Sequence, residues 1–143
     1  MSIRPVIPYL DVLNHLQYAS ATLILGSTER HYTPSKAFQA VQARRPILAV
    51  LHEASTAAAF LRQARAGHVV TFPDGGLPEV AGLAEALRTL VSGADSGPAT
   101  PPDVDWAVVD QYSARASARA LASALDEAFE RHTKGRTMVA RGQ

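Results

Sequence analysis

The stretch that decides the fold covers residues 21–51 and reads ATLILGSTERHYTPSKAFQAVQARRPILAVL. It begins with a short apolar run, which is typical of a strand covered on both faces. A polar loop follows, and Ala37, Phe38 and Val41 then recur at the spacing of a buried helix face. A second apolar run, residues 46–51, follows that helix. This strand–helix–strand unit predicts an α/β fold with a parallel sheet.

The same alternation extends to both sides of this stretch. The other expected elements are a helix over residues 8–19, a helix that Ser55 caps and Gly67 ends, a strand over residues 68–72, a helix that Pro78 opens, and a last helix that Ser113 caps. Together they predict a Rossmann-like parallel sheet of three to four strands in a three-layer α/β/α arrangement. So short a sheet exposes its edges, so we expect either a covering partner or a missing part of a larger domain.

Composition shifts divide the chain into four expected parts. Residues 1–92 form the Rossmann-like core, and residues 93–105, rich in Gly, Pro, Ser and Asp, form a flexible linker. Residues 106–132 form a helical segment that packs on the same domain, and residues 133–143 form a frayed tail. The apolar residues expected to face inward from the last helix are Ala118, Leu121, Leu125 and Phe129.

The bulk composition is that of an ordinary globular protein. The chain has 143 residues, of which 47% are apolar and 19% are charged, and its net charge is +1. This charge gives no sign of a nucleic-acid partner. The lack of cysteine excludes disulfides and thiolate metal sites. The chain shows no signal-peptide core and no apolar run of membrane-spanning length, so we expect a cytoplasmic protein without a membrane span.

Three loops leave the predicted strand ends, at residues 26–33, 52–55 and 73–78. In an open α/β sheet, ligands bind beyond the carboxyl ends of the strands. Each of these loops also precedes the beginning of a helix, where free N–H groups favour an anion. A phosphate-bearing ligand is therefore the default hypothesis.

Lys36 sharpens this hypothesis because a cation in the first turn of a helix opposes the helix dipole. The chain otherwise prefers arginine to lysine, twelve to two. A lysine at this position suits a phosphate, which it can meet as a point charge. A solvated surface lysine is the alternative. Gln39, three positions later, lies on the same helix face and can share the ligand, although an exposed glutamine without a task is equally common.

The residues just before this helix offer weaker indications. Thr33 is the expected N-cap and Pro34 the expected first helical residue. His31 and Tyr32 precede the cap, and His31 can either act on a ligand or hydrogen-bond the loop.

Several motif classes are excluded. The pair His52-Glu53 invites a zinc interpretation, but the second histidine of that motif is replaced by Thr56. The chain contains neither a Gly-x-Gly-x-x-Gly motif nor a P-loop. Ser27 and Ser55 lack the Gly-x-Ser-x-Gly context of a hydrolase nucleophile.

Three stretches carry a resemblance to a known family: YASATLILGS at residues 18–27, HYTPSKAFQ at residues 31–39 and ARRPILAV at residues 43–50. The chain resembles the C-terminal, sugar-nucleotide-binding half of GT-B glycosyltransferases of the group-1 retaining type. The resemblance covers residues 4–72 well and the remainder loosely. It implies that the core of residues 1–92 binds a nucleotide sugar, with a helix whose N-terminus faces the phosphates of that donor.

The resemblance also implies roles for individual residues. Lys36 matches the lysine near the diphosphate, and Gln39 falls where a ribose-binding glutamate normally stands. His31 takes the place of the first glutamate of the paired-acid motif, so both acids are absent. Glutamine still hydrogen-bonds a ribose hydroxyl, without the assistance of a charge. The residues expected at the donor site are Ser27, His31, Tyr32, Thr33, Ser35, Lys36 and Gln39.

The resemblance further implies parts that this chain lacks. The family's C-terminal half begins with another strand–loop–helix unit, and an acceptor-binding N-terminal domain precedes it. We therefore expect a fragment that is inactive alone and needs that domain or a partner subunit. In the intact enzyme it would hold a nucleotide-diphosphate sugar, without a further cofactor or metal, while the sugar passes to an acceptor hydroxyl.

Two alternatives from other classes stay open. One is a non-catalytic oligomerisation or partner-docking module, including a homodimer that forms through the exposed sheet edge. The other is a small phosphate-ligand-binding α/β domain unrelated to sugar transfer.

Overall fold

The computed structural model describes residues 6–30, 32, 35–95 and 103–140. Its elements in chain order are α1 (Tyr9–Tyr18), β1 (Thr22–Leu25), α2 (Lys36–Gln42), β2 (Ile47–His52), α3 (Thr56–Gln63), β3 (His68–Phe72), α4 (Val80–Asp95), α5 (Trp106–Asp110) and α6 (Ala114–Ala140). The three strands pair in parallel in the order β1-β2-β3. The predicted α/β fold with a parallel sheet is therefore confirmed.

The chain divides into two compact units, residues 1–105 and residues 106–143. The first contains the sheet and α1 to α4, and the second contains α5 and α6. In the first unit, α4 continues to Asp95, three residues into the expected linker. In the described part of the chain, no helix combines the length and the apolar character needed to cross a membrane.

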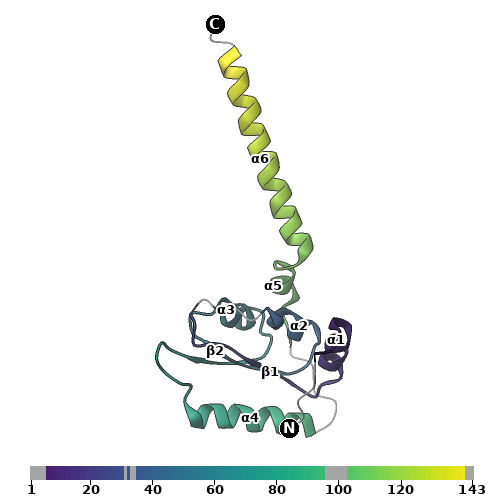
Figure 1. Ribbon diagram of the computed structural model, residues 1–143, viewed down its shortest axis with the longest axis vertical. Helices are drawn as coiled ribbons and strands as arrows, with labels where there is room; N and C mark the ends of the chain where they lie inside the picture. The colour runs from purple at the N-terminus through teal and green to yellow at the C-terminus, as the bar shows by residue number, and fades with distance from the viewer. Residues whose placement is uncertain (1–5, 31, 33–34, 96–102, 141–143) are drawn as a thin grey trace. The chain divides into compact units, whose positions relative to one another are not determined.

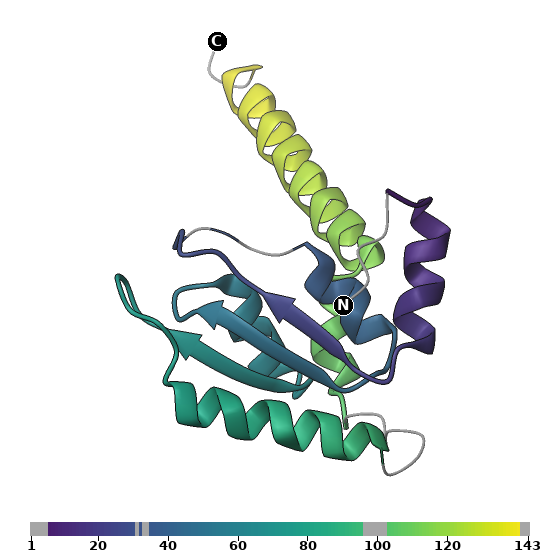
Figure 2. The ribbon, with the colours of Figure 1, turned by 60° about the horizontal axis from the view of Figure 1, so that its bottom comes forward.

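The sheet of the first unit lies between two layers of helices (Figures 1 and 2). Helix α4 covers one face, and α2 and α3 cover the other. The central strand β2 is buried at all six positions, which explains its continuous apolar run. Its last residue, His52, pairs in register with Phe72 of β3. The ends of the two strands therefore lie side by side.

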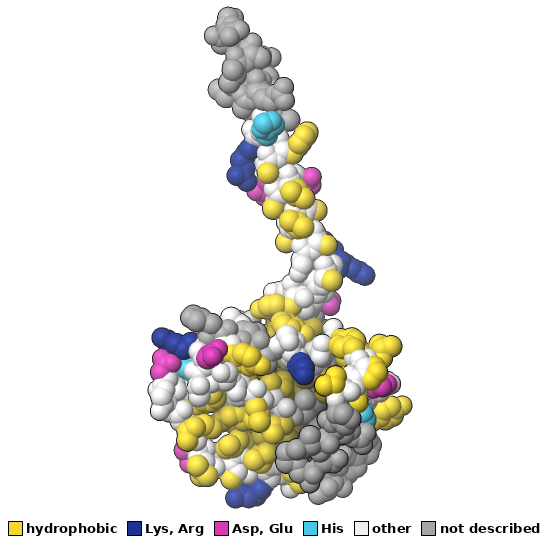
Figure 3. Space-filling model, in the orientation of Figure 1, with side chains coloured by type: hydrophobic (Ala, Val, Ile, Leu, Met, Phe, Trp, Pro, Cys, Tyr) yellow, Lys and Arg dark blue, Asp and Glu magenta, His cyan; other side chains and the backbone are white. Residues whose placement is uncertain are grey.

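The edge strand β1 departs from the expectation that both of its faces are covered. Ile24 is buried, but Leu23 is 50% exposed and Leu25 is 65% exposed. Helix α4 packs on β2 and β3, so the side chains that alternate with Ile24 on β1 lack the cover that β2 has. Figure 3 shows hydrophobic side chains gathered in this region of the surface. The apolar run identified the strand but not its position at the edge.

The core lies between β2 and the helices that flank it. The Phe60 ring of α3 is 2% exposed, and its centroid lies 4.5 Å from that of Phe38 in α2. Burying a side chain of this size contributes roughly 1.5–3 kcal/mol to folding. Ala37 and Val41 are buried as predicted, whereas Phe38 is half-buried.

The predicted start of the last helix is confirmed, since the Ser113 hydroxyl accepts a hydrogen bond from the Ala116 N–H at 3.1 Å. The helix then continues to Ala140, where a tail was expected. Ser55 stands at the N-cap of α3, but its side chain makes no capping hydrogen bond. The expected cap at Thr33 and Pro34 lies outside the described residues.

Two further helix predictions need correction. Helix α3 ends at Gln63, and Arg65, with φ 50°, takes the left-handed conformation expected two residues later, at Gly67. In α4, the apolar spacing of Val80, Leu83 and Leu87 predicts one buried stripe, but Val80 is 79% exposed, whereas Ala86 is buried. Helix α4 therefore buries the face that carries Ala86. The apolar spacing could not identify this face, because neighbouring stripes of an alanine-rich helix are similarly apolar.

Gly67 provides the first testable prediction. Its φ is +153°, and a Cβ added there would lie 2.6 Å from the carbonyl oxygen of Ile47. We expect Gly67→Ala to lower the free energy of unfolding, measured by chemical denaturation, by about 1–3 kcal/mol. The backbone at residue 67 or at Ile47 must either move away from the added Cβ or remain strained. Gly93→Ala is the matched control, since nothing lies within 4 Å of its added Cβ and Gly93 sits in α4. Equal stability of the two variants would contradict the prediction.

Candidate functional site

A cavity of about 480 Å³ lies between α1, β1 and α2. Three of the predicted site residues, Tyr32, Ser35 and Lys36, line it. The other lining residues are Val12, Leu16, Thr22, Leu23, Ile24, Leu25 and Ala40. One side of the cavity is therefore polar and cationic, and the other side is largely apolar.

The strand–helix connection after β1 positions the polar side of this cavity. Strand β1 ends at Leu25, and the chain crosses to α2, whose first residue is Lys36. The Tyr32 carbonyl oxygen accepts a hydrogen bond from the buried Ser55 hydroxyl at 3.4 Å. This contact ties the connection to the loop that follows β2.

Lys36 is the charged group of the cavity. Its side chain is exposed, and no ion pair joins it to another residue in the described part of the chain. The first turn of α2 carries no acid that could neutralise it. An ammonium group offers three donors and no acceptor, so an anionic ligand is the natural complement of Lys36.

Thr22 is a cavity residue that the sequence reasoning missed. Its hydroxyl oxygen is buried and has no hydrogen-bond partner among the described residues. A buried polar group without a partner costs about 1–3 kcal/mol. Because this oxygen is closed to solvent, a ligand in the cavity does not reach it in this structure. Nothing in the sequence marks this threonine, because it stands inside a short apolar strand.

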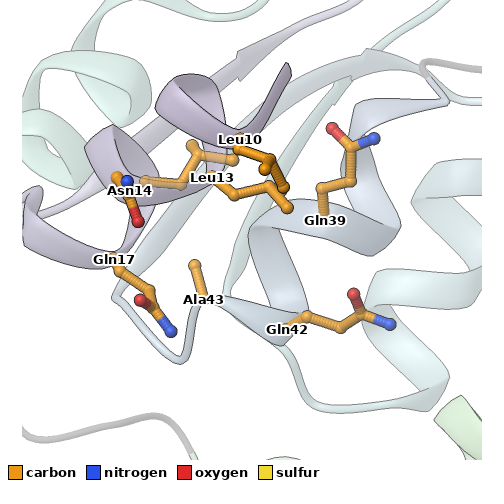
Figure 4. A pocket seen from close by; sticks show the side chains of 8 residues that line it. Leu10, Leu13, Asn14, Gln17, Gln39, Gln42 and Ala43 are labelled. Carbon is orange, nitrogen blue, oxygen red and sulfur yellow. The ribbon is translucent and has the colours of Figure 1, made fainter. Parts of the chain in front are cut away.

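Gln39 lines a neighbouring crevice of about 410 Å³ between α1 and α2. Figure 4 shows Leu10 and Leu13 pointing into the gap between the two helices, whereas the amide of Gln42 points away from it. The Gln39 amide lies 3.3 Å from the Tyr9 hydroxyl and donates a hydrogen bond to it. Lys36 and Gln39 thus stand in the walls of two different cavities.

The remaining predicted site residues lie elsewhere or are not described. The Ser27 hydroxyl accepts a hydrogen bond from the Glu29 N–H at 3.1 Å, which shapes the start of the loop. Ser27 is not among the residues that line the Lys36 cavity. His31 and Thr33 lie outside the described residues.

A second polar cluster, formed by His52, Asp74 and Arg30, joins the loops that follow the three strands. His52 is 2% exposed, and its Nε2 lies 3.0 Å from Asp74 Oδ1. The Ala54 N–H donates to His52 Nδ1 at 3.1 Å, so the ring proton belongs on Nε2, which donates to Asp74. Arg30 Nε lies 3.3 Å from the other carboxylate oxygen of Asp74.

The geometry of this cluster argues for a structural task. Both ring nitrogens of His52 are engaged, which leaves no lone pair for a general base. The Ser55 hydroxyl donates to a carbonyl oxygen and not to His52, so no nucleophile–base pair forms. No group of three or more His, Asp or Glu side chains gathers into a metal site within the described residues.

Comparison with known proteins finds no matching family model, no matching curated protein and no matching solved structure. The resemblance to GT-B glycosyltransferases therefore rests on the sequence stretches alone, and the fold and the cavity are what the structure adds.

Proposed function

We propose that this chain binds the diphosphate of a nucleotide-diphosphate sugar in the Lys36 cavity, as the donor-binding part of a glycosyltransferase. The observation that carries the proposal is Lys36, which has no counter-ion among the described residues and lines a cavity whose opposite side is largely apolar. The resemblance of residues 18–50 to the sugar-nucleotide-binding half of such enzymes supports it independently.

The chemistry of the cavity fits such a ligand. Its volume of about 480 Å³ falls within the usual range of small-molecule sites. Lys36 would meet the diphosphate as a point charge. The Ser35 hydroxyl would hydrogen-bond polar ligand atoms, and Tyr32, 45% exposed, offers an apolar ring surface to the base or the sugar.

The proposed reaction moves a sugar from phosphate to an acceptor. The bond between the anomeric carbon and the diphosphate oxygen breaks, and a bond to the acceptor hydroxyl oxygen forms as that hydroxyl loses its proton. Negative charge develops on the leaving diphosphate, where Lys36 would stabilise it. The binding site for the acceptor and the group that takes its proton would belong to a further domain or to a partner subunit.

The Lys36→Ala variant tests this proposal. In a thermal-shift titration with UDP, GDP, ADP and their sugar conjugates, the nucleotides that carry one of the three bases should raise the melting temperature of the wild type. We expect Lys36→Ala to weaken that binding about 10-fold or more, because hydrogen bonds to charged groups contribute roughly 1.5–3 kcal/mol. Arg88→Ala, which removes a cation from α4, is the matched control and should bind as the wild type does.

The outcomes separate the candidate functions. If none of these nucleotides shifts the melting temperature, or if Lys36→Ala binds as tightly as the wild type, the proposal fails. If inorganic phosphate raises the melting temperature as much as the nucleotides do, the result would favour the small phosphate-binding domain.

The second candidate function is a non-catalytic docking module. It is favoured by the exposed Leu23 and Leu25 on an edge strand without charged residues, and it predicts that no phosphate ligand changes the melting temperature.

A further inference from the structure

Three adjoining cavities follow the boundary between α1 and α2. The Lys36 cavity and the crevice between the two helices share the lining residue Leu16. A third cavity, of about 360 Å³, shares Gln17 and Ala43 with that crevice. The three cavities therefore follow one another along α2, from its first residue to the turn beyond its last.

Two arginines give the third cavity, here called the Arg45 cavity, a positive charge. Arg44 and Arg45 line it, and none of its described lining residues is acidic. Arg45 is half-buried, and its Nε donates a hydrogen bond to the Gln17 carbonyl oxygen at 2.7 Å. This bond holds the guanidinium against the end of α1. No ion pair joins Arg45 to another residue in the described part of the chain. Its two Nη groups therefore suit an oxyanion that is bound by two parallel hydrogen bonds.

The crevice between the two cationic cavities is neutral. No charged residue is among its described lining residues, whereas Asn14, Gln17 and Gln39 bring carboxamides to it. A carboxamide both donates and accepts hydrogen bonds, which suits hydroxyl groups. Leu10 and Leu13 point into the gap and offer an apolar surface (Figure 4). The crevice therefore suits an uncharged group that carries hydroxyls on a carbon ring, which describes a sugar.

The order of the three cavities matches one extended ligand. Arg44 follows Lys36 by eight positions, which is about 12 Å along a helix. A cationic, a neutral and a second cationic surface in this order call for an anion, a neutral group and a second anion. A nucleotide-diphosphate sugar supplies the first two, with its diphosphate at Lys36 and its sugar in the crevice. An acidic group on the sugar supplies the third.

We infer that the donor sugar carries an acidic group, as a uronic acid does, and that Arg45 binds its carboxylate. This inference rests on the proposed function, because the diphosphate at Lys36 fixes one end of the ligand. It adds the class of sugar and a residue that selects it. A neutral hexose would occupy the crevice without engaging Arg45, so the chain should bind the acidic sugar more tightly than its neutral counterpart.

Matched donor conjugates test this specificity. Isothermal titration calorimetry on the full chain would compare UDP, GDP and ADP conjugates of glucuronic acid with those of glucose, and of mannuronic acid with those of mannose. Within each pair, the only difference is that a carboxylate replaces a hydroxymethyl group. For the base that binds, we expect at least one acidic conjugate to bind about 10-fold more tightly than its neutral counterpart, because charge-assisted hydrogen bonds are the strong ones.

Two variants assign this preference to Arg45. Arg45→Gln should abolish the preference and leave the affinity for the neutral conjugate unchanged. Arg62→Gln is the matched control, because Arg62 is an exposed arginine of α3 that also donates one hydrogen bond, at 3.1 Å to the Thr71 hydroxyl. This variant should keep the full preference. Melting temperatures without ligand check that both variants fold.

The failure of this inference differs from the failure of the proposed function. Equal affinity for the acidic and the neutral conjugate in every pair would overturn the inference and leave nucleotide binding standing. An equal loss of both affinities in Arg45→Gln would also overturn it, because Arg45 would then only hold α1 in place. If no nucleotide binds at all, both the inference and the proposed function are wrong.

Discussion

Phe60→Ala is expected to lower the free energy of unfolding by about 3–5 kcal/mol. The ring is 2% exposed and packs against Phe38 at a centroid distance of 4.5 Å. Its removal leaves a cavity among the buried side chains that hold α2 and α3 on β2, and this cavity adds to the lost burial. Since a domain of this size is stable by about 5–15 kcal/mol, the variant loses a large part of its stability.

Urea denaturation monitored by circular dichroism measures this loss. Tyr18→Ala is the matched control, because it also truncates an aromatic side chain but one that is 86% exposed. Its effect should stay within about 0.5 kcal/mol, as for most surface substitutions. If the two variants unfold at the same urea concentration, Phe60 is not the core residue that its burial indicates.

The second large effect is expected at His52. His52→Ala should lower the free energy of unfolding by about 2–5 kcal/mol, for two physical reasons. The ring is buried and contacts Phe72 edge-on, so its removal opens a cavity. The Ala54 N–H also loses the acceptor that Nδ1 provides. The same denaturation experiment measures the change.

An exposed histidine provides the comparison for this prediction. His68 stands at the start of β3 with an exposed side chain, and His68→Ala should change stability by no more than about 0.5 kcal/mol. Similar losses in both variants would mean that the bonds from His52 to Asp74 and Ala54 contribute nothing specific. A loss confined to His52→Ala would support its role in joining the strand ends.

The elements of the fold followed from apolar patterns, because these patterns report burial directly. Strand β2 could be predicted from its uninterrupted apolar run, and the cap at Ser113 from side-chain chemistry. The edge position of β1 could not be predicted, because the run at residues 22–25 says nothing of what lies beside it. For the same reason the exposure of Leu23 was missed.

The candidate site was predictable only where it is local in sequence. Tyr32, Ser35 and Lys36 lie within five residues of one another and line one cavity, and their role in binding a ligand stays a prediction. The bond between His52 and Asp74 spans 22 residues and depends on the register of β2 with β3. The wall that Thr22 and α1 form depends on how the helix packs, which no local pattern reports. The roles that the family resemblance gives to His31 and Gln39 stay predictions.

The central claim is that the Lys36 cavity binds a nucleoside diphosphate. The most direct test is a titration of the ¹⁵N-labelled chain with UDP, GDP and ADP, followed by NMR. The account predicts saturable shifts for one of them, centred on the amides of Tyr32, Ser35, Lys36 and Thr22, and much weaker in Lys36→Ala. Unchanged spectra with all three, or shifts centred on residues that do not line this cavity, would contradict it.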